Sequence, residues 1–416
     1  MIVYFIFTLV ILLIQALLLV EGYRHCVFTR RKYRPKACKN QPPAAIICPC
    51  KGLDNTFDRN IHSLFEQAYD RYEVFFVVQS QEDPAYPRLK KIIQQRQNAG
   101  GRVTAHILIA GAAETCVQKV HNLITACDAL PEAIQVMAFV DSDTCLKSHF
   151  LDSLVYPLFR RTVGATTGYR WFVPTDQRLS SQMLSAMNAA VASLLGPHRW
   201  NSAWGGAMAV RRDTYHAIGL RQAWQNACSD DFLLTRQVKK ARLNVEFVPA
   251  CFVASYEQMS WRELFSFARR QFIITRVCMF RLWLLALFGW GHSVLAFWIG
   301  LAVTGTLLLR HSWQAPYAAV LPAALMLAFM TRAAARQSLI RKILPEDKKK
   351  LALPALIDIF LGPLVGSYAL VCVLAAAGTR TIVWRQIKYH LKDINHTQIL
   401  PCRTCRTSRT DGNSNP

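Results

Sequence analysis

Residues 44–84 read AAIICPCKGLDNTFDRNIHSLFEQAYDRYEVFFVVQSQEDP. Two short apolar runs in this stretch, 44–48 and 72–78, have the length and composition of buried parallel strands. The segment between them, 55–69, is amphipathic and predicts a helix. Its apolar face is formed by four residues: Ile61, Leu64, Phe65 and Ala68. A strand, a helix and a second strand in this order predict one βαβ unit.

The same alternation continues along the chain. Residues 102–109 and 134–141 predict further strands, and 116–130 predict a helix between them. Strands that alternate with helices are typical of an α/β domain with a parallel sheet, which we assign to 44–256. Ligands bind at the carboxyl ends of such strands. We therefore expect the functional site where strands 72–78 and 134–141 end.

The composition favours a membrane protein. Of 416 residues, 52% are hydrophobic and 18% are charged, while 49 Lys and Arg against 26 Asp and Glu give a net charge of +23. So few charges in so hydrophobic a chain argue against a disordered basic tail or a soluble nucleic-acid binder, and we expect no nucleic-acid partner. Thirteen cysteines at this length predict mostly reduced thiols.

Residues 1–23 predict an uncleaved transmembrane anchor. The first 20 residues carry no charge, and about 20 apolar residues span a bilayer as a helix. The segment that follows, 24–43, is a basic linker without an acidic residue. The positive-inside rule therefore places the α/β domain in the cytoplasm and the N-terminus outside.

A transmembrane hairpin is predicted over 282–331, because 282–309 and 315–331 are apolar enough to cross and return. The segment just before it, 257–281, mixes aromatic residues with five arginines. It predicts an amphipathic helix that lies along the cytoplasmic leaflet, although an ordinary basic juxtamembrane helix has the same pattern.

The remaining C-terminal segments give conflicting topological signals. Both 332–352 and 379–416 are basic and favour the cytoplasm, so a single crossing by the apolar segment 353–378 would place the tail outside. The prolines and glycines of that segment favour a broken or re-entrant element. Its Asp358 either faces the protein interior with a functional role or pairs with a nearby base.

The end of the chain carries little information about function. Residues 404–416 are polar and predict a disordered tail. Cys402 and Cys405 form a lone Cys-x-x-Cys pair, which is weak evidence for zinc. The oligomeric state is left open by the sequence.

Asp141 and Asp143 form an Asp-x-Asp motif at the end of a predicted strand. Alternate residues of an extended chain share a side, so both carboxylates can face one divalent cation and the ribose or pyrophosphate of a nucleotide. The motif alone also fits solvated loop acids. Its position directly after an apolar strand favours the binding site.

A second acidic pair, Asp230 and Asp231, stands at a predicted helix start. Ser229 or Asp230 could simply cap that helix. Alternatively, a carboxylate beside a bound sugar could take the proton of an attacking hydroxyl. Asp83 is a third candidate, although Asp-Pro is also common in turns.

These motifs occur in an order that resembles the membrane-bound family 2 glycosyltransferases, especially the ceramide glucosyltransferase group and its bacterial relatives. The resemblance covers roughly 44–276 and extends more loosely to IVWRQIKY at 382–389. It implies a GT-A fold, a Rossmann-like α/β domain between an N-terminal anchor and a helical membrane region. The stretches that carry it are ICPCKGLD to QEDPAYP at 47–87, VDSDT at 140–144, WGGAMAVRRDTY at 204–215 and SDDFLLTRQVKKA at 229–241.

The resemblance also implies an inverting transfer from a nucleotide-diphosphate sugar with Mg²⁺ or Mn²⁺. By motif, Asp141 lies near the ribose or sugar, Asp143 binds the metal and Asp231 deprotonates the acceptor hydroxyl. The Asp-rich turn of the family is altered in this chain. The carboxylate role near the nucleotide base therefore falls on Glu82 or Asp83.

The family's Gln/Arg-x-x-Arg-Trp motif survives only as ARRQF at 268–272, without its Trp or the expected Arg. Phe272 can still stack, and Arg269, Arg270 or Arg276 can still meet the diphosphate. Besides the acids above, the residues assigned to the nucleotide-sugar are Lys51, Arg269, Arg270 and Gln271. The residues assigned to the acceptor side are His198, Trp204, Gly206, Asp230 and Phe272.

The resulting hypothesis is a hexosyltransferase that moves glucose or a related sugar from a UDP-sugar to a hydroxyl of a membrane lipid such as ceramide. Its partners would be the donor, the lipid acceptor and the bilayer. A processive polysaccharide synthase of the same superfamily is one alternative. A noncatalytic membrane scaffold that retains the fold is another.

Overall fold

A seven-stranded mixed sheet organises the middle of the chain in this computed structural model, which describes residues 2–38 and 41–401. The order of its strands is β3-β2-β1-β4-β6-β5-β7, and only β6 runs antiparallel to its neighbours. The predicted α/β domain with a mainly parallel sheet is confirmed. The strands are β1 (Ala44–Pro49), β2 (Tyr72–Val78), β3 (Thr104–Ile109), β4 (Val136–Val140), β5 (Val163–Pro174), β6 (Ala207–Arg211) and β7 (Asn244–Glu257).

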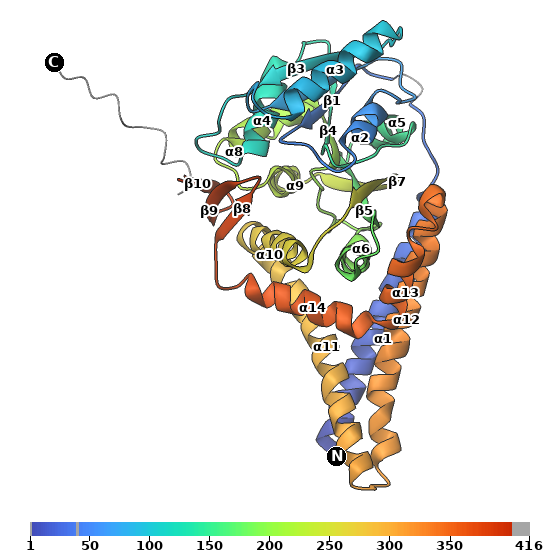
Figure 1. Cartoon of the computed structure of the whole chain (residues 1–416). Helices are drawn as coiled ribbons and strands as arrows, with labels where there is room; N and C mark the ends of the chain where they lie inside the picture. Colours follow the sequence, from blue (N-terminus) through green and yellow to red (C-terminus); the bar gives the residue numbers. More distant parts are fainter. Residues whose placement is uncertain (1, 39–40, 402–416) are drawn as a thin grey trace, which may run out of the picture.

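Helices cover both faces of this sheet and bury two separate apolar cores (Figure 1). Helices α2, α3 and α5 lie on one face, and α4, α8 and α9 lie on the other. The helices of the domain are α2 (Phe57–Leu64), α3 (Ala85–Asn98), α4 (Gln118–Ala129), α5 (Phe150–Val155), α6 (Leu179–Ala192), α7 (Arg212–Ala217), α8 (Leu220–Trp224) and α9 (Asp230–Lys240). A 3-10 turn at Tyr156–Phe159 follows α5.

The helix predicted over 55–69 is too long. Helix α2 ends at Leu64 because the chain beyond it finds partners elsewhere: the Ala68 N–H donates to the Ser148 carbonyl at 2.7 Å. Such a tertiary hydrogen bond ends a helix without any local sequence signal.

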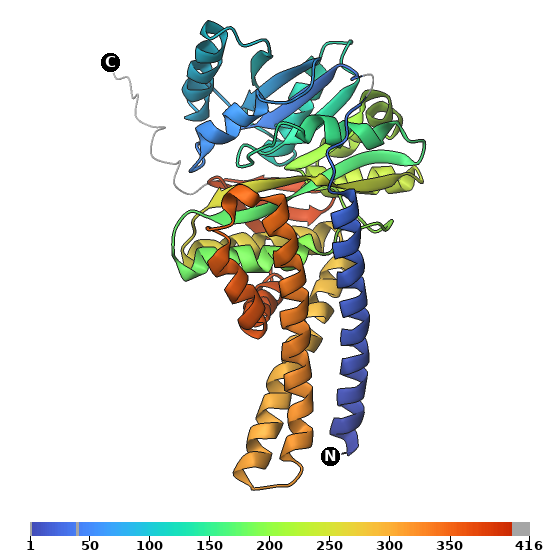
Figure 2. The ribbon, with the colours of Figure 1, turned by 90° about the vertical axis from the view of Figure 1, so that its right-hand side faces the viewer.

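Among the described residues, three helices are long and apolar enough to cross a membrane: α1 (Ile2–Lys32), α11 (Phe280–Leu309) and α12 (Ala315–Ile343). They run together below the sheet, and α1 packs along α12 (Figure 2). Helix α1 continues beyond the predicted anchor into the basic segment 24–43, and α12 continues beyond the predicted hairpin into the basic segment 332–352. Basic residues suit a helix C-terminus, where they offset the negative end of the helix dipole.

The apolar segment 353–378 is broken, as its prolines and glycines predicted. It forms α13 (Ala352–Phe360) and α14 (Gly362–Ala375), which meet at an angle of 87°. Helix α14 turns away from α12 and runs across the long helices beneath the domain (Figure 1). The chain therefore returns to the α/β domain instead of following α11 and α12 to their far end.

Helix α10 (Trp261–Cys278) covers the segment predicted as an interfacial helix. A capping box between Ser260 and Glu263 fixes its start. Its buried residues pack against α6 and α14 and, near its end, against the core of the sheet.

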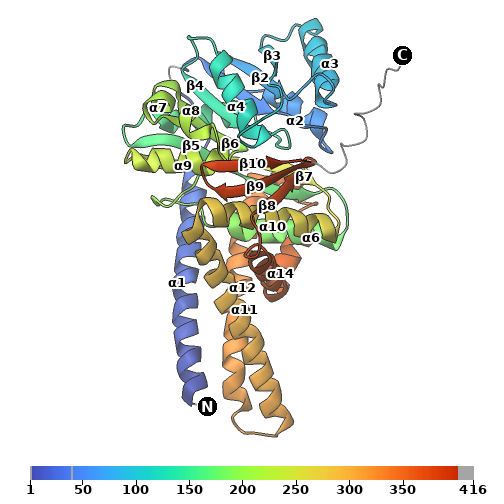
Figure 3. The ribbon, with the colours of Figure 1, turned by 90° about the vertical axis from the view of Figure 1, so that its left-hand side faces the viewer.

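The basic segment 379–416 is not simply a tail. Residues 381–400 form an antiparallel sheet of β8 (Thr381–Trp384), β9 (Ile387–Asp393) and β10 (His396–Leu400). This C-terminal sheet lies against the α/β domain and α10 (Figure 3), and Tyr389 and Leu391 are fully buried. The predictions for Cys402, Cys405 and the tail 404–416 lie outside the described residues.

Asp358 on α13 is paired with a base. Its carboxylate accepts hydrogen bonds from the Arg336 Nε at 2.7 Å and from the Gln337 side-chain amide at 2.8 Å, both on α12. Asp358 is only 1% exposed. The contact ties the broken element to the long helix, so the paired alternative is the one that the structure supports.

We expect Asp358→Ala to destabilise the protein by about 2–4 kcal/mol, because it leaves the partly buried Arg336 charge without its carboxylate partner. Thermal unfolding in detergent measures this. Asp213→Ala, which removes an exposed partner of Arg211, is the control and should cost about 0–1 kcal/mol. Normal unfolding of Asp358→Ala with loss of activity would instead favour a functional carboxylate.

Candidate active site

The loops that follow β1, β2 and β4 meet at one edge of the sheet, because β1 pairs with both other strands. Asp83, after β2, accepts hydrogen bonds from the Gly52 N–H at 2.8 Å and the Ala85 N–H at 3.0 Å. It thereby joins two of the loops and caps the start of α3. Lys51 donates to Gln79 at 2.5 Å in the same place. Glu82, the other predicted carboxylate, is exposed and turned to solvent.

Lys119 brings the two predicted acidic pairs together. From α4 its ammonium lies 2.8 Å from an Asp141 oxygen and 3.0 Å from an Asp230 oxygen. Although burial alone lowers it, the charges of Asp141, Asp230 and Asp231 raise the pKa of Lys119. The end of β4 and the start of α9 therefore form one site around a permanently charged lysine that the sequence analysis missed.

Asp143 has one paired and one free carboxylate oxygen. Its Oδ2 lies 3.1 Å from Arg170 of β5, while its Oδ1 is buried without a hydrogen-bond partner. Burial raises the pKa of Asp143 to about 6. Arg170 is held over the rings of Trp204 and Phe172, each with its centroid 4.9 Å away. These cation–π contacts fix the cation that faces Asp143.

Asp231 is oriented by hydrogen bonds at the first turn of α9. Its Oδ1 accepts from the Phe232 N–H at 2.7 Å and from the Ser229 hydroxyl, and its Oδ2 accepts from the Gly205 N–H at 3.2 Å. Ser229 is also the residue that caps α9, as one of the two alternatives predicted. Asp231 shares this cap through its Oδ1, whereas its Oδ2 faces the glycine loop.

The glycine loop, Gly205–Gly206, leaves room for these charges. A Cβ on Gly205 would lie 2.2 Å from an Asp230 oxygen and 2.6 Å from the Lys119 nitrogen. One on Gly206 would lie 2.2 Å from the Trp204 ring and 2.8 Å from an Asp141 oxygen. The loop requires glycine because backbone and carboxylates approach so closely.

We expect Gly206→Ala to abolish activity and to destabilise the domain by about 1–3 kcal/mol, because the added methyl displaces Trp204 and Asp141. Enzyme assays and thermal unfolding of the purified protein measure both effects. Gly378→Ala is the matched control, since its Cβ would meet nothing within 4 Å. Activity retained by Gly206→Ala would mean that this close approach is not needed.

Two further carboxylates belong to the site, although the sequence analysis did not single them out. Asp54, after β1, accepts from the Ser142 hydroxyl at 2.8 Å and pairs with Arg385. Glu257 ends β7. Burial, together with Asp143 and Asp54 nearby, raises the pKa of Glu257 from 4.5 to about 7.

This shift makes stability depend on pH. The unfolded state ionises Glu257 near pH 4.5, whereas the folded state keeps the proton until about pH 7, so folding stability falls as the pH rises between these values. We expect Glu257→Gln to remove this loss and to raise stability by about 1–3 kcal/mol at pH 8, with a smaller gain at pH 5. Melting curves of both proteins test this, and an equal gain at both pH values would contradict it.

The residues of the ARRQF stretch on α10, and Arg276 after it, contact different parts of the structure. The Arg269 Nε donates to the Ala375 carbonyl at 3.1 Å, and Arg276 donates to the Thr379 carbonyl at 2.6 Å, so both hold the segment around the end of α14. Phe272 packs between two apolar cores. The Gln271 carbonyl accepts a hydrogen bond from the Thr275 hydroxyl at 2.8 Å, and its side chain makes no hydrogen bond with the other described residues. Arg270 donates to the Val383 carbonyl at 3.4 Å and also lies near Asp143: burial, and after it Arg170 and Arg385, lower its pKa to about 10, and the charge of Asp143 opposes this shift.

His198 lies away from this site. Its ring bonds the Leu194 carbonyl at 3.0 Å, four residues before it at the end of α6. This local bond is the structural role that a lone histidine often has, and no contact among the described residues joins it to the carboxylates. Trp204 and Asp230, by contrast, lie within the site.

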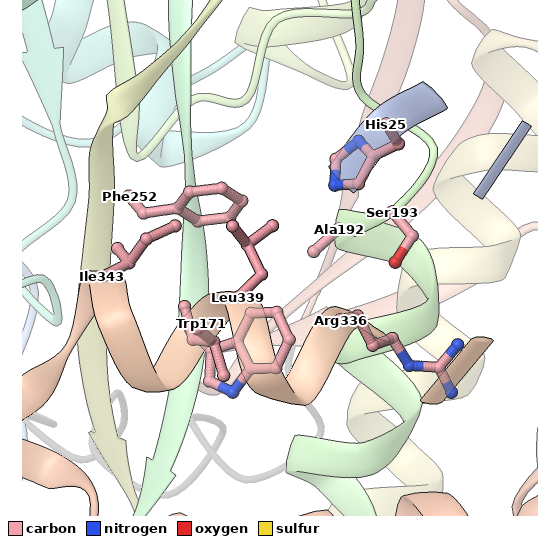
Figure 4. A pocket seen from close by; sticks show the side chains of 9 residues that line it. His25, Trp171, Ala192, Ser193, Phe252, Arg336, Leu339 and Ile343 are labelled. Carbon is pink, nitrogen blue, oxygen red and sulfur yellow. The ribbon is translucent and has the colours of Figure 1, made fainter. Parts of the chain in front are cut away.

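The small cavity of Figure 4 is also separate. It holds about 10 Å³, room for one water molecule, where α1, α6 and α12 meet β5 and β7. His25, Trp171 and Arg336 lie among its lining residues, and none of the predicted site residues does.

The carboxylates fit a divalent cation that is completed by a substrate. Asp143 offers a buried oxygen without a partner, and Asp141 stands two residues before it on the same edge. Such hard oxygen donors suit Mg²⁺ or Mn²⁺. Among the described residues, no group of three or more His, Cys, Asp or Glu side chains could hold a metal ion.

Comparison with solved structures finds distant similarities. The mannosyltransferase PcManGT from Pyrobaculum calidifontis, in complex with GDP-Man and Mn²⁺, is 16% identical over 88% of this chain and 97% of its own, with a TM-score of 0.44. GalNAc-T7 with UDP, GalNAc and Mn²⁺ is 13% identical over 58% of this chain and 48% of its own, with a TM-score of 0.41.

The family assignment is much stronger. A family profile described as glycosyl transferase family 21 matches residues 3–396, nearly the whole chain and all three candidate membrane helices. The motifs predicted a glycosyltransferase of the ceramide glucosyltransferase type, although under family number 2. The chain belongs to glycosyl transferase family 21, the ceramide glucosyltransferase family, and is a glycosyltransferase.

Proposed function

We propose that the protein transfers a hexose, glucose or a close relative, from a UDP-sugar to a hydroxyl of a membrane lipid such as ceramide, with inversion at the anomeric carbon. The observation that carries this proposal is the meeting of Asp141, Asp143 and Asp231 at one sheet edge, in a domain attached to apolar helices. The carboxylates proposed to bind the sugar donor, Asp141 and Asp143, and the one proposed to act on the acceptor, Asp231, would then lie in one site of a GT-A domain.

The donor would bind across the ends of β1, β2 and β4. Lys51 and Asp83 are proposed to face the nucleoside, and Asp141 the ribose or sugar. Asp143, with Asp141, would hold Mg²⁺ or Mn²⁺, which when bound offsets the negative charge that develops on the departing diphosphate. Arg270 adds a protein charge on the side of the phosphates.

Asp231 is proposed as the base for the acceptor. The hydroxyl oxygen forms a bond to the anomeric carbon while the bond from that carbon to the diphosphate oxygen breaks, and the hydroxyl proton passes to Asp231. Attack from the face opposite the leaving diphosphate inverts the anomeric configuration. The N–H of Gly205 and the Ser229 hydroxyl hold the Asp231 carboxylate toward the acceptor.

The membrane helices support a lipid acceptor at the cytoplasmic face. The basic ends of α1 and α12 lie on the side of the α/β domain. By the positive-inside rule, that side would face the cytoplasm and the N-terminus would lie outside. Three candidate spans, or four if the bent pair is counted, are few for a polymer channel. A nonprocessive enzyme is therefore favoured over a polysaccharide synthase.

A donor panel tests the proposal. The purified protein in nanodiscs of mixed lipids receives labelled UDP-glucose, UDP-galactose, UDP-N-acetylglucosamine or GDP-mannose with Mg²⁺ or Mn²⁺, and the products are partitioned. Label in the organic phase from one UDP-sugar is expected. Label in a high-mass aqueous product would favour the polysaccharide synthase, and no transfer from any donor would favour the noncatalytic scaffold.

A further inference from the structure

The tip of the β8–β9 hairpin reaches back to the donor side of the site. Arg385, at this tip, pairs with Asp54 from the loop after β1. Asp54 in turn accepts from Ser142, the middle residue of the Asp-Ser-Asp motif, at 2.8 Å. A residue from the last part of the described chain is thus connected through one carboxylate to the motif proposed to bind the donor.

Arg385 lies close to the turn after β1 and to two other cations. A Cβ on Gly52 would lie 3.8 Å from a terminal nitrogen of Arg385, so the guanidinium lies over the turn that follows β1. Its charge contributes to lowering the pKa of Lys51 and Arg270. Lys51 in the loop after β1 and Arg270 on α10 therefore both lie near Arg385, and such a cluster of cations favours an anionic ligand.

The backbone at this tip is strained. Arg385 and Gln386 have φ values of +47° and +67°, and they form a two-residue turn of the kind that usually contains Asn-Gly or Gly. A residue with a side chain is less stable in this left-handed conformation than glycine is. Strain of this sort persists where function requires the side chain.

The rest of the hairpin is built to hold the tip in place. Tyr389 is fully buried, and its hydroxyl accepts from the Gln118 N–H at 3.2 Å, one residue before Lys119. Trp384, Ile387 and Ile399 pack against the core beneath the sheet. The C-terminal sheet is therefore a rigid support for Arg385 and is fixed to the same helix start that carries Lys119.

We propose that Arg385 binds the diphosphate of the nucleotide-sugar and thereby supplies the arginine that the ARRQF stretch of α10 lacks. This inference rests on the proposed function. Arg269 and Arg276 are engaged with backbone carbonyls, whereas Arg385 presents a planar fork that suits two phosphate oxygens. Asp54 holds the guanidinium at the site.

Binding of UDP compared with uridine tests the assignment, because only UDP carries the diphosphate. Titration calorimetry with Mn²⁺ on the full chain in detergent gives both dissociation constants, with GDP and guanosine as a second pair. Arg385→Ala is expected to weaken UDP binding about 10- to 100-fold and to leave uridine binding unchanged. Lys388→Ala removes an exposed charge from the same sheet and serves as the control, with no change in either constant.

The outcomes separate the two proposals. If the wild type binds no nucleoside diphosphate more tightly than its nucleoside, the proposed function fails and the inference fails with it. If the wild type prefers UDP and Arg385→Ala keeps that preference, the inference alone is overturned. Should Arg385→Ala not fold, Arg385→Gln decides in its place, since it keeps the length of the side chain and removes only the charge and the fork.

Discussion

Replacing Asp231 with asparagine is expected to lower sugar transfer by about 10²- to 10⁴-fold, the usual contribution of a positioned base. Asparagine has nearly the same shape, and its one carbonyl oxygen can still accept from the Phe232 N–H, so the start of α9 should remain intact while the longer bond from the Gly205 N–H is lost. It cannot take a proton from the acceptor. Turnover should therefore collapse while the affinity for UDP and the melting temperature change little.

Two measurements on the same preparation distinguish this from general damage. Titration with UDP and Mn²⁺ reports the donor site, and product formation reports the base. Asp213→Asn, an exposed acid on α7, is the matched control and should behave as the wild type. Wild-type turnover in Asp231→Asn would exclude Asp231 as the base, and loss of UDP binding would assign it to the donor.

Replacing Asp143 with alanine is expected to abolish metal-dependent donor binding. Loss of an outer-shell partner typically lowers metal affinity 10- to 100-fold, so loss of a direct ligand should cost at least that much. The change also frees Arg170 from its carboxylate partner. UDP affinity in Mn²⁺ should fall to the level that the wild type shows in EDTA, because the remaining contacts involve protein groups alone.

Titrations in Mn²⁺ and in EDTA on both proteins check this expectation. A UDP affinity that stays metal-dependent in Asp143→Ala would move the cation to another carboxylate of the site, such as Asp141, Asp54 or Glu257. Asp213→Ala should retain both the affinity and its metal dependence.

Local patterns were sufficient to predict much of the fold. The apolar runs at 44–48, 72–78 and 134–141 correspond to β1, β2 and β4, because buried parallel strands require continuous apolar residues. Asp141 and Asp143 directly follow this apolar run, so the end of the run also predicts that they lie at the end of β4. The break in 353–378 could be predicted because proline and glycine disfavour a continuous helix.

What the sequence could not predict depends on pairing between distant residues. Lys119 and Arg170 are ordinary basic residues until the fold sets them opposite Asp141, Asp230 and Asp143. No local pattern distinguishes them from surface charges.

The C-terminal sheet was missed for a related reason. Its charged residues favoured a solvated tail, although the alternation of apolar and polar residues in 381–400 is typical of strands with one buried face. His198 and Arg269 were selected by resemblance alone, and both bond backbone carbonyls outside the acidic cluster.

The most direct test of the account is sugar transfer by the wild type and Asp231→Asn side by side, in membranes supplied with labelled UDP-sugars, Mg²⁺ or Mn²⁺ and mixed lipids. Label in the organic phase that forms with the wild type and disappears with Asp231→Asn is the predicted result. Equal organic label from both proteins, or none from the wild type with any donor, would contradict a lipid glycosyltransferase that uses Asp231 as its base.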